Sequence, residues 1–413
     1  MEHTLQVSIL KELMQQLDEG KNVDAGVQYK MPTASYVCPD TANREREILF
    51  QQHPQLIGLS GDLPEPGNYI TLADFGTPIL ATRDKNGLFH AFLNACRHRA
   101  VRVASEPRGK KNIFTCPFHS WSYSVQGELV SIPNEDHFGS VDKSCHGLIE
   151  LPAVECDGLL WVHPQPDGLL DVESLLGPLA KELSSYSLAD LCYAGGTTIE
   201  MNLNWKLAND TFGETYHFQK LHKNTLGKIF YGNNLHFKEF GRHHRFVTAS
   251  KGIDRLRAIP EADWDITKGS FVLYYLFPNI QLIVNNDSCT LIRIYPDANN
   301  SGRSLTQISF FFSQQAIDTA AAAQHDDSIK KVTAGNVYDR DSRVEGVQTL
   351  AASLEIFSST IEHEDYKMGE LQQKSAENGL LKEVMFGRNE PALHHFHNSF
   401  RAALGQEALQ AIE

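Results

Sequence analysis

The chain has 413 residues, of which 41% are hydrophobic and 21% are charged, and its formal net charge is −14. This length predicts two or three domains, and the composition is that of a folded globular protein. The acidic excess argues against nucleic acid as a partner. The longest apolar stretch, residues 271–284, is interrupted by Pro278, Asn279 and Gln281, so we expect no membrane-spanning helix. The N-terminus lacks a basic segment followed by an apolar one, which predicts a cytoplasmic protein.

The spacing of apolar residues predicts a helical segment followed by a small β domain. Residues 5–18 carry leucine and isoleucine at helical spacing, and residues 40–51 suit a second short helix. The pattern then changes to short strands joined by Asn-Gly and Gln-Gly turn signals. The proline-rich run at 164–166 predicts a linker. We therefore expect an N-terminal helical segment at 1–45 and a β domain at 46–165.

Residues 166–413 mix helical and strand-like patterns and form the second expected domain, on which the segment 1–45 would pack. A curved antiparallel sheet with helices at one side accommodates this order, so the expected fold class is α+β. Strand patterns occur at residues 197–202, 235–240, 244–249, 271–277, 280–284, 289–295 and 305–312. Helical patterns occur at residues 170–176, 179–185, 205–221, 316–324, 344–359 and 364–375.

Two short motifs in the β domain carry metal-ligating side chains. Cys96-Arg97-His98 and Cys116-Pro117-Phe118-His119 each offer one thiolate and one imidazole, and seventeen residues separate them. Structural zinc sites usually group the cysteines and then the histidines. The alternating order instead suits a two-iron cluster in which one iron takes both cysteines and the other takes both histidines. Zinc is the alternative interpretation. The other five cysteines show no paired spacing and are expected to be reduced.

A second group of potential ligands lies in the predicted helix 205–221 and just beyond it. Two histidines and a carboxylate with open positions form the usual site of a non-haem Fe(II) that activates oxygen. Glu214 and His217 are three residues apart and would share one helix face. His217 and His222 are five apart, or about 140° around an ideal helix, so both reach one metal only if the helix is distorted or ends near His222. A solvated helix with two histidines is the alternative.

Together, these motifs resemble the terminal oxygenase (α) subunit of Rieske non-haem iron oxygenases. In that family, Asn-Trp-Lys is followed by an acidic residue, by Tyr-His and by a second histidine five residues later. The matching residues here are Asn204, Trp205, Lys206, Glu214, Tyr216, His217 and His222. The resemblance implies a β-rich Rieske domain at 46–165 and a catalytic domain at 166–413 with a START-like, helix-grip fold. It covers nearly the whole chain.

The resemblance also implies two iron cofactors. A [2Fe–2S] Rieske cluster would be held by Cys96, His98, Cys116 and His119, and a mononuclear Fe(II) by His217, His222 and a carboxylate near the C-terminus. Family members take that carboxylate from an aspartate followed eight residues later by glutamine, which Asp365 and Gln373 match; Glu362 and Glu364 compete for the role. Asn209 and Asp210 would support the iron ligands or only cap the helix.

In such a family member, an NAD(P)H-dependent reductase or a ferredoxin supplies electrons, and O₂ is used to oxidise a small molecule. Hydroxylation by mono- or dioxygenation and N-demethylation all fit, on an aromatic, alicyclic or quaternary ammonium substrate. The family implies a homotrimer, with or without a β subunit, in which Glu214 links His119 of one chain to His217 of the next. The family commonly has aspartate at position 214, and glutamate occurs in the branch that oxidises quaternary ammonium compounds such as carnitine.

Two other functions compete with an oxygenase. A Rieske-type electron carrier without oxygenase activity would resemble respiratory Rieske proteins, which have an extra cysteine in each ligand loop and a membrane anchor; the sequence shows neither. A regulatory scaffold would have lost ligands, but all are present. The substrate stays open. We expect Phe230, Tyr231, Phe246 and Phe271 to face the pocket, where an aromatic cage would favour a quaternary ammonium ligand and an apolar pocket an aromatic or alicyclic one.

Overall fold

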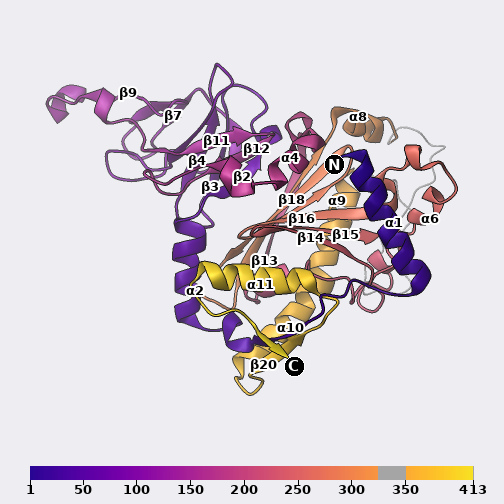
Figure 1. The fold of residues 1–413 in the computed structure, drawn as a ribbon. Coiled ribbons are helices and arrows are strands. Elements are labelled where there is room, and N and C mark those ends of the chain that lie inside the picture. Colours follow the sequence, from indigo (N-terminus) through magenta and orange to yellow (C-terminus); the bar gives the residue numbers. More distant parts are fainter. Residues whose placement is uncertain (324–349, 413) are drawn as a thin grey trace. The chain divides into compact units, whose positions relative to one another are not determined.

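Figure 1 shows the computed structural model of the chain, which describes residues 1–323 and 350–412. The chain forms two compact units. The larger unit combines Met1–Arg44, Leu176–Tyr186 and Tyr193–Glu413, and the smaller one combines Glu45–Leu175 and Ser187–Cys192. The expected α+β class is confirmed, since a strand-rich unit accompanies one that mixes helices and a large sheet. Within the described ranges, no helix is long and apolar enough to cross a membrane.

The smaller unit consists of short antiparallel strands in three sheets, with the orders β10-β5-β4-β3-β6, β11-β12-β2 and β7-β8-β9. Tight turns such as the one at Gly87, which has a positive φ of 80°, connect neighbouring strands. The strands are β2 (Gln55–Leu59), β3 (Asn68–Leu72), β4 (Ile79–Arg83), β5 (Phe89–Leu93), β6 (Arg108–Lys110), β7 (Ile113–Thr115), β8 (Ser122–Ser124), β9 (Leu129–Ser131), β10 (Glu150–Leu151), β11 (Ala153–Cys156) and β12 (Leu159–Val162).

Aromatic side chains form the core beneath the metal motifs of this unit. Tyr69 and Phe114 meet edge to face with ring centroids 5.2 Å apart, and Tyr123 is fully buried beside them. Burying a large apolar side chain contributes about 1.5–3 kcal/mol. Strands β7 and β8 form a hairpin whose connection contains the second metal motif, so the packing of Phe114 and Tyr123 fixes where that motif lies.

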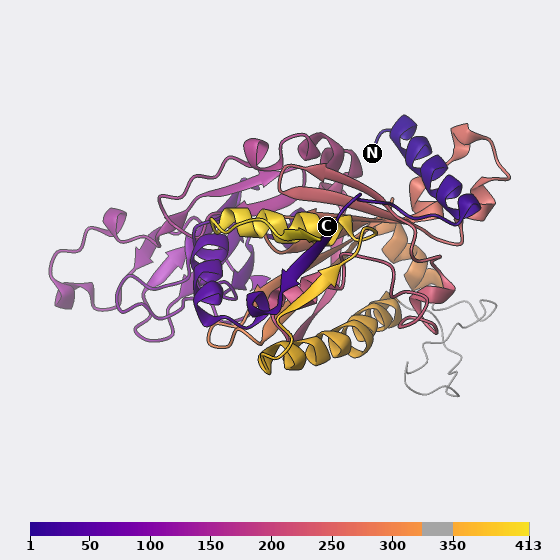
Figure 2. The same cartoon turned by 60° about the horizontal axis from the view of Figure 1, so that its bottom comes forward.

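The larger unit is built on a seven-stranded antiparallel sheet with the order β13-β19-β18-β17-β16-β15-β14. The inner strands β16, β17 and β18 are buried along most of their length, whereas the edge strands β13 and β14 are largely accessible. The strands of this sheet are β13 (Cys192–Met201), β14 (His236–Phe240), β15 (His243–Ala249), β16 (Ser270–Leu276), β17 (Ile280–Val284), β18 (Ser288–Pro296) and β19 (Ser304–Phe312). A small second sheet joins β1 (Gln28–Pro32), β20 (Glu383–Phe386) and β21 (Gln410–Ile412). Figures 1 and 2 show β1 beside β20, although the two are far apart in sequence.

Helices pack on the sheet through aromatic contacts. Trp205 of α5 meets Phe396 of α11 with ring centroids 5.9 Å apart, and Phe396 meets Tyr275 of β16 at 5.3 Å. All three side chains are almost fully buried. The helices are α1 (His3–Glu19), α2 (Pro39–Glu45), α3 (Val172–Leu176), α4 (Leu179–Leu183), α5 (Trp205–Asp210), α6 (Ile253–Leu256), α7 (Ile266–Gly269), α8 (Gln314–Ala323), α9 (Leu350–Thr360), α10 (Tyr366–Glu377) and α11 (Pro391–Ala403), with π-helical turns at Arg46–Gln51 and Ile361–Asp365.

The prediction of one helix over residues 205–221 is wrong. The Asn204 side chain caps α5 by accepting the amide of Lys206 at 3.0 Å, but this helix ends at Asp210 and turns follow. Gly213 lies in these turns and is a poor helix former. The absence of a side chain lets the backbone pass close to α11, since a Cβ at this position would lie 2.2 Å from Cδ2 of Leu393.

Other sequence expectations differ from the structure or extend beyond its described residues. Of the helix expected at 344–359, residues 350–359 lie in α9, whereas residues 344–349 lie outside the described residues, as does Gln324 of the helix expected at 316–324. Helix α10 begins at Tyr366 rather than at 364, after the π-helical turn. Helix α11 and the small β1-β20-β21 sheet were not expected from sequence spacing.

Candidate metal centres

The two cysteine-histidine motifs of the smaller unit form loops with the same backbone hydrogen bonds. In each loop, the amide four positions after the cysteine donates to the cysteine carbonyl, at 2.8 Å from Ala100 to Cys96 and at 3.0 Å from Ser120 to Cys116. The carbonyl five positions after the cysteine, that of Val101 or Trp121, accepts a hydrogen bond from the cysteine amide at 2.8 Å in both loops. Ala100 and Ser120 have positive φ values of 60° and 59°, which cost a non-glycine residue roughly 1–2 kcal/mol. Local hydrogen bonds thus hold each cysteine in place.

The two cysteine thiols are buried and close to each other. Burial, with a further contribution from Cys96, raises the pKa of the Cys116 thiol above its ordinary value. The Tyr123 hydroxyl lies 3.2 Å from Sγ of Cys96 and accepts the amide of Arg97 at 2.9 Å. A buried pair of thiols costs free energy when it is deprotonated, unless a cation compensates the charge. The pair therefore suits one metal ion bound through two sulfur atoms.

The histidines of the same loops have free ring nitrogens. The rings of His98 and His119 lie 4.5 Å apart, and Nδ1 of each is buried without a hydrogen-bond partner. An unsatisfied buried polar atom costs about 1–3 kcal/mol, so both atoms fit a metal ion as the missing partner. Trp121 stacks on His98 at 5.2 Å, and Phe138 packs against both rings. Two thiols beside two free Nδ1 atoms match the donor set of a Rieske [2Fe–2S] cluster.

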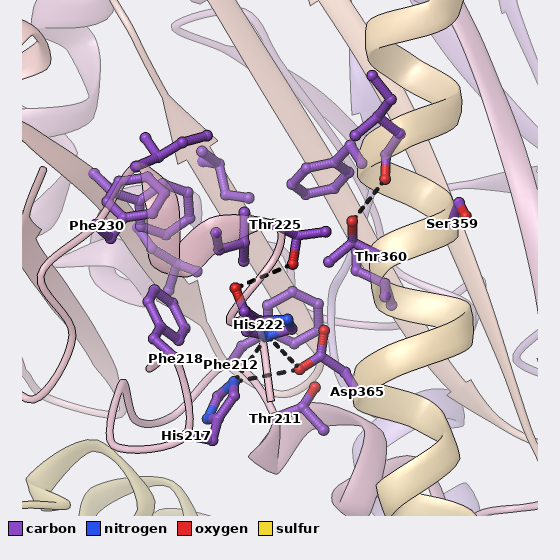
Figure 3. Close-up of a pocket in the computed structure, with 18 of the residues that line it drawn as sticks. Thr211, Phe212, His217, Phe218, His222, Thr225, Phe230, Ser359, Thr360 and Asp365 are labelled. Atoms are coloured by element: carbon purple, nitrogen blue, oxygen red, sulfur yellow. Dashed lines mark hydrogen bonds and ion pairs between the residues drawn. The ribbon is translucent and has the colours of Figure 1, made fainter. Parts of the chain in front are cut away.

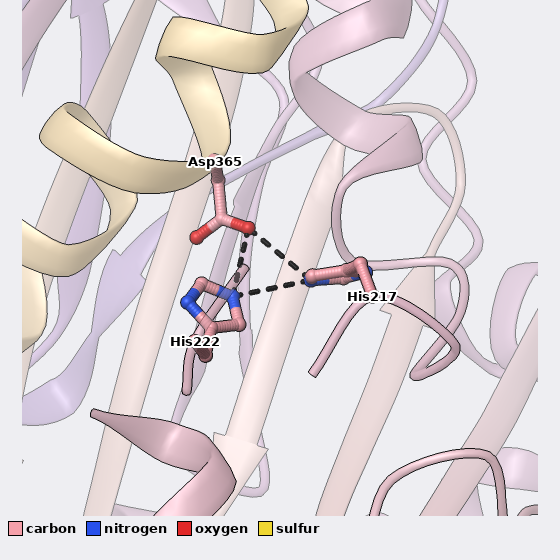
Figure 4. A group of neighbouring side chains, drawn as sticks. All are labelled: His217, His222 and Asp365. Carbon is pink, nitrogen blue, oxygen red and sulfur yellow. Dashed lines mark hydrogen bonds and ion pairs between the residues drawn. The ribbon is translucent and has the colours of Figure 1, made fainter. Parts of the chain in front are cut away.

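Three side chains converge in the larger unit. His217 and His222 come from the turns that follow α5, and Asp365 ends the π-helical turn before α10. Nε2 of His217 and Nε2 of His222 are 3.1 Å apart, and Oδ1 of Asp365 lies 3.1 Å from His222 and 3.3 Å from His217. Figure 4 shows the two rings and the carboxylate directed toward one common point. This set of one ligand atom from each residue fits a non-haem iron with open positions.

Two glutamates hold the outer ring nitrogens of the triad. Nδ1 of His217 donates to Glu214, whose carboxylate also accepts the amides of Tyr216 and His217. Nδ1 of His222 donates to Glu364 at 2.5 Å, and the Thr225 hydroxyl donates to the same carboxylate at 3.0 Å. These contacts fix each ring so that Nε2 faces the other ligands, as second carboxylates do at histidine metal sites.

The charges of the triad depend on one another. Burial lowers the pKa of His217, but its hydrogen bonds to Asp365 and Glu214 outweigh this effect and raise the pKa to about 10. Burial opposes the charged form of His222 as well, and hydrogen bonds to Asp365 and Glu364 raise its pKa above the ordinary value. Burial alone would raise the pKa of Asp365, but the hydrogen bonds to the two histidines have the larger effect and lower the pKa below its ordinary value. Without a metal, the site thus holds protons where a cation would bind.

The structure separates the residues that sequence analysis left as alternatives. Among the described residues, the side chains close enough to share one metal are His217, His222 and Asp365, which leaves Glu362 and Glu364 outside the set. Asp210 accepts hydrogen bonds at 2.8 Å from Tyr36 and from His397, so it joins α5 to its neighbours rather than to the triad.

Asn209 also points away from the triad. Oδ1 of Asn209 accepts a hydrogen bond from Nε2 of Gln281 in β17 at 2.8 Å, and this contact ties α5 to the sheet. Glu364, which the sequence offered as a competing ligand, acts instead behind His222. Its role could not be read from the sequence, because it depends on which ring nitrogen of His222 faces the π-helical turn.

A cavity of about 760 Å³ opens beside the triad. Figure 3 shows Phe218 and Phe230 on one side of it and Thr360 of α9 on the other. The expected pocket residues Phe230, Phe246 and Phe271 line it, whereas Tyr231 does not and instead hydrogen-bonds to Asp254. The lining residues are Thr211, Phe212, Glu214, His217, Phe218, His222, Asn224, Thr225, Leu226, Ile229, Phe230, Phe246, Phe271, Leu273, Ile283, Glu355, Ile356, Phe357, Ser359, Thr360, Ile361, His363 and Asp365.

A second cavity, of about 800 Å³, also borders the ligands. It shares Glu214, His217 and Asp365 with the first cavity, whereas His222 lines only the first. Its rim carries apolar side chains that are unusually exposed: Met368 at 42%, Leu371 at 55%, Leu381 at 47% and Met385 at 60%. Exposed apolar groups around a depression are typical of a surface that binds another protein.

Similar proteins of known function are oxygenase subunits. The chain is 29% identical to the oxygenase subunit of carnitine monooxygenase from Acinetobacter baumannii over 211 residues, which cover 51% of the chain and 57% of that protein. It is 29% identical to the oxygenase subunit of glycine betaine monooxygenase from Chromohalobacter salexigens over 203 residues, which cover 49% of the chain and 45% of that protein. The large subunit of anthranilate 1,2-dioxygenase from Acinetobacter baylyi is 26% identical over 237 residues, which cover 54% of the chain and 46% of that protein. The chain thus spans about half the length of these relatives.

Solved structures share the fold over almost the whole chain. A quaternary ammonium Rieske monooxygenase in complex with L-carnitine superposes with a TM-score of 0.71 at 20% identity, covering 93% of this chain and 97% of the other. Naphthalene 1,2-dioxygenase from Rhodococcus superposes with a TM-score of 0.69 at 18% identity, covering 96% of this chain and 98% of the other.

Two family models match consecutive parts of the chain. The Rieske [2Fe-2S] domain matches residues 53–151, and the catalytic domain of the ring hydroxylating alpha subunit matches residues 188–406. The first implies a [2Fe–2S] cluster and the second a mononuclear non-haem iron, in agreement with the donor atoms described above. Because the catalytic-domain model alone spans more than half of the sequence, the chain belongs to the family of ring-hydroxylating alpha subunits with a Rieske domain.

Proposed function

We propose that this chain is the terminal oxygenase component of a multi-component system. It would take electrons from an NAD(P)H-dependent reductase or a ferredoxin and use O₂ to oxidise a small organic substrate. One observation carries the proposal: a single chain holds a closed cysteine-histidine set and an open triad beside an apolar cavity. When bound, the cluster supplies single electrons and the mononuclear iron supplies activation of dioxygen.

The residues divide into two tasks in this proposal. The cluster is bound by two cysteines and two histidines: Cys96, His98, Cys116 and His119. His217, His222 and Asp365 bind the catalytic iron, with Glu214 and Glu364 orienting the two rings. The phenylalanine-lined cavity keeps bulk water from the reacting centre and holds the substrate beside the triad.

We further propose that electrons pass between neighbouring chains of a homotrimer, with or without a β subunit, through Glu214. This carboxylate already contacts His217 and borders the second cavity with its exposed apolar rim. On the cluster unit, Phe118 is 51% exposed and lies beside His119, so an apolar tip is available to dock on such a rim. One carboxylate can accept from two imidazoles, which would place Glu214 between His119 of one chain and His217 of the next.

A reducing compartment suits this chain, and we propose the cytoplasm. All seven cysteines are free in the structure. Disulfides are rare in reducing compartments, and thiolate ligands must stay reduced to hold a cluster.

Metal analysis tests the oxygenase proposal against an electron carrier. An oxygenase chain reconstituted with iron and sulfide should contain about three irons and about two sulfides, and a carrier about two of each. Reduction by a surrogate reductase, followed by a substrate screen that monitors oxygen uptake and product mass, then tests turnover. A chain with two irons and no substrate-dependent oxygen uptake would contradict the proposal.

Subunit mixing tests the electron route. Cys96→Ala chains keep the catalytic iron without a cluster, and His217→Ala chains keep the cluster without that iron, so each alone should be inactive. Co-assembled chains should regain activity, because some junctions pair an intact cluster with an intact iron site. Glu214→Gln should lose most of the recovered activity even when excess Fe(II) fills its weakened iron site and the cluster content is unchanged. If verified mixed oligomers stay inactive, electrons do not cross between chains and this part of the proposal is wrong.

A further inference from the structure

We propose that the cavity beside the triad takes an uncharged, largely apolar ring compound and discriminates against compounds that carry a carboxylate or a quaternary ammonium group. The inference rests on the proposed oxygenase function, since it names the substrate class of the same site. It departs from the substrates in the names of the carnitine and glycine betaine relatives, which carry both charges, and from anthranilate, which carries a carboxylate.

Aromatic rings form one wall of the cavity, and this wall begins at the metal ligands. The ring of Phe218 lies 5.0 Å from that of His217 and 5.5 Å from that of His222. Phe230 follows at 5.9 Å from Phe218, and Phe271 at 5.6 Å from Phe230. Flat rings at these separations favour another ring in stacked or edge-to-face contact. A ring compound in this cavity would therefore be held next to the triad.

The central sheet supplies an apolar floor. Phe246 of β15 pairs with Leu273 of β16, and Leu273 pairs with Ile283 of β17, so three apolar side chains form one row across neighbouring strands. Phe271 lies two positions before Leu273 on the same strand and thus on the same face. Ile356 of α9 lines the cavity as well. Apolar surface of this extent stabilises a bound apolar ligand by displacing water.

Charge complementarity for an anion is missing from the described lining. Neither lysine nor arginine occurs among the described residues that line the cavity. Its carboxylates are Asp365 and Glu214, which both contact triad histidines, and the exposed Glu355. Away from the iron, a carboxylate on the substrate would lose its hydration without gaining a basic side chain from the described lining.

A quaternary ammonium group also lacks its usual partners. Sites for such cations surround them with aromatic faces, among which tryptophan and tyrosine are the stronger and phenylalanine the weaker. The aromatic side chains among the described lining residues, apart from histidine, are all phenylalanine, and Tyr231 lies outside the lining. The phenylalanine rings alone compensate poorly for removing a cation from water, whereas an uncharged ring has no such cost.

Two shape-matched ligand pairs test this inference on the iron-loaded, cluster-containing protein. tert-Butylbenzene and phenyltrimethylammonium differ by one positive charge, and nitrobenzene and benzoate differ by one negative charge. We expect the uncharged member of each pair to bind at least tenfold more tightly, measured by calorimetry without turnover. Equal or tighter binding of phenyltrimethylammonium, or of benzoate, would overturn the proposal.

Variants locate the binding in this cavity. Phe230→Ala should weaken tert-butylbenzene binding at least fivefold, whereas Phe237→Ala, on β14 and outside the lining, should leave it unchanged. Phe271→Arg should bring benzoate affinity to at least that of nitrobenzene, which is a gain that misfolding cannot produce. Retained iron and cluster content verifies the fold of each variant. An unchanged ligand preference in a folded Phe271→Arg protein would contradict the assignment.

The test separates this inference from the proposed function. If uncharged rings bind selectively but no ring compound supports oxygen uptake with a competent reductase, the substrate class stands as a binding class and the oxygenase proposal fails. If the protein turns over a carboxylate or quaternary ammonium compound in preference to uncharged rings, the oxygenase proposal stands and this inference is wrong.

Discussion

The cluster motifs and the iron triad use histidine in opposite ways. In the smaller unit, Nδ1 of His98 and of His119 is free to bind a metal. In the larger unit, Nδ1 of His217 and of His222 donates to a glutamate, and Nε2 faces the other ligands. A histidine bound through Nε2 can be oriented and made more basic through Nδ1. The triad histidines thus use Nδ1 to contact a supporting carboxylate, whereas the cluster histidines keep Nδ1 for the metal.

The two sites also differ in how much of the chain holds them. Each cluster loop fixes its cysteine through hydrogen bonds to residues four and five positions later. Asp365, by contrast, is 143 positions from His222, and only the packing of the π-helical turn against the segment after α5 brings them together. Local sequence therefore builds the cluster loops, whereas the triad requires the folded larger unit.

The largest expected effects come from removing one ligand of each site. Cys96→Ala should lose the cluster irons and the sulfide but keep the mononuclear iron, and Asp365→Ala should do the reverse. Both variants should lose more than 99% of turnover, since each centre is required. Iron and sulfide analysis with visible absorption checks this. Loss of both centres in either variant, with the fold intact by circular dichroism, would mean that the two sites are not independent.

The second layer should matter less than the ligands but still clearly. Glu364→Gln weakens the support of Nδ1 of His222, and such changes cost about 10–100-fold in metal affinity. Metal titration of the iron-depleted protein, read by cobalt absorption, measures the change. Glu362→Gln is the matched control on the same turn and should change affinity less than twofold. Equal effects of the two variants would remove Glu364 from this role.

Metal affinity of the triad should rise with pH. The pKa of His217 is raised from 6.5 to about 10 in the metal-free site, so a metal must displace its proton. Between these values, the affinity should increase by up to about tenfold per pH unit for each proton released. The same shift stabilises the metal-free fold below pH 6.5, and this contribution is lost as the pH rises toward 10. Cobalt titrations from pH 6.5 to pH 8.5 check the slope; a flat profile would contradict it.

The smallest expected effect concerns the cluster potential. Tyr123→Phe removes the hydroxyl that lies 3.2 Å from Sγ of Cys96. A hydrogen bond of about 1 kcal/mol stabilises the more negative reduced cluster, which corresponds to roughly 40 mV for one electron. The midpoint potential should therefore fall by about this amount, measured by redox titration. Tyr69→Phe, whose ring packs on Phe114, should leave the potential unchanged.

The sequence alone pointed to the cysteine and histidine donors and to most strands of the large sheet. The C-x-H and C-x-x-H motifs indicate a two-iron cluster because a metal site needs specific side chains at short spacing, and short spacing is visible in sequence. Most strands of the large sheet also match their predicted ranges, since apolar runs between turn signals mark buried strands.

Only the tertiary structure decided how the iron ligands meet. The prediction of a helix through His217 left that residue and His222 about 140° apart. In the structure α5 ends at Asp210, and the turns that follow remove this constraint. Glu364 likewise became a partner of His222 through a π-helical turn whose position no local pattern marks. Packing between segments far apart in sequence sets both features, because the free energy that selects them comes from contacts with other elements rather than from local backbone preference.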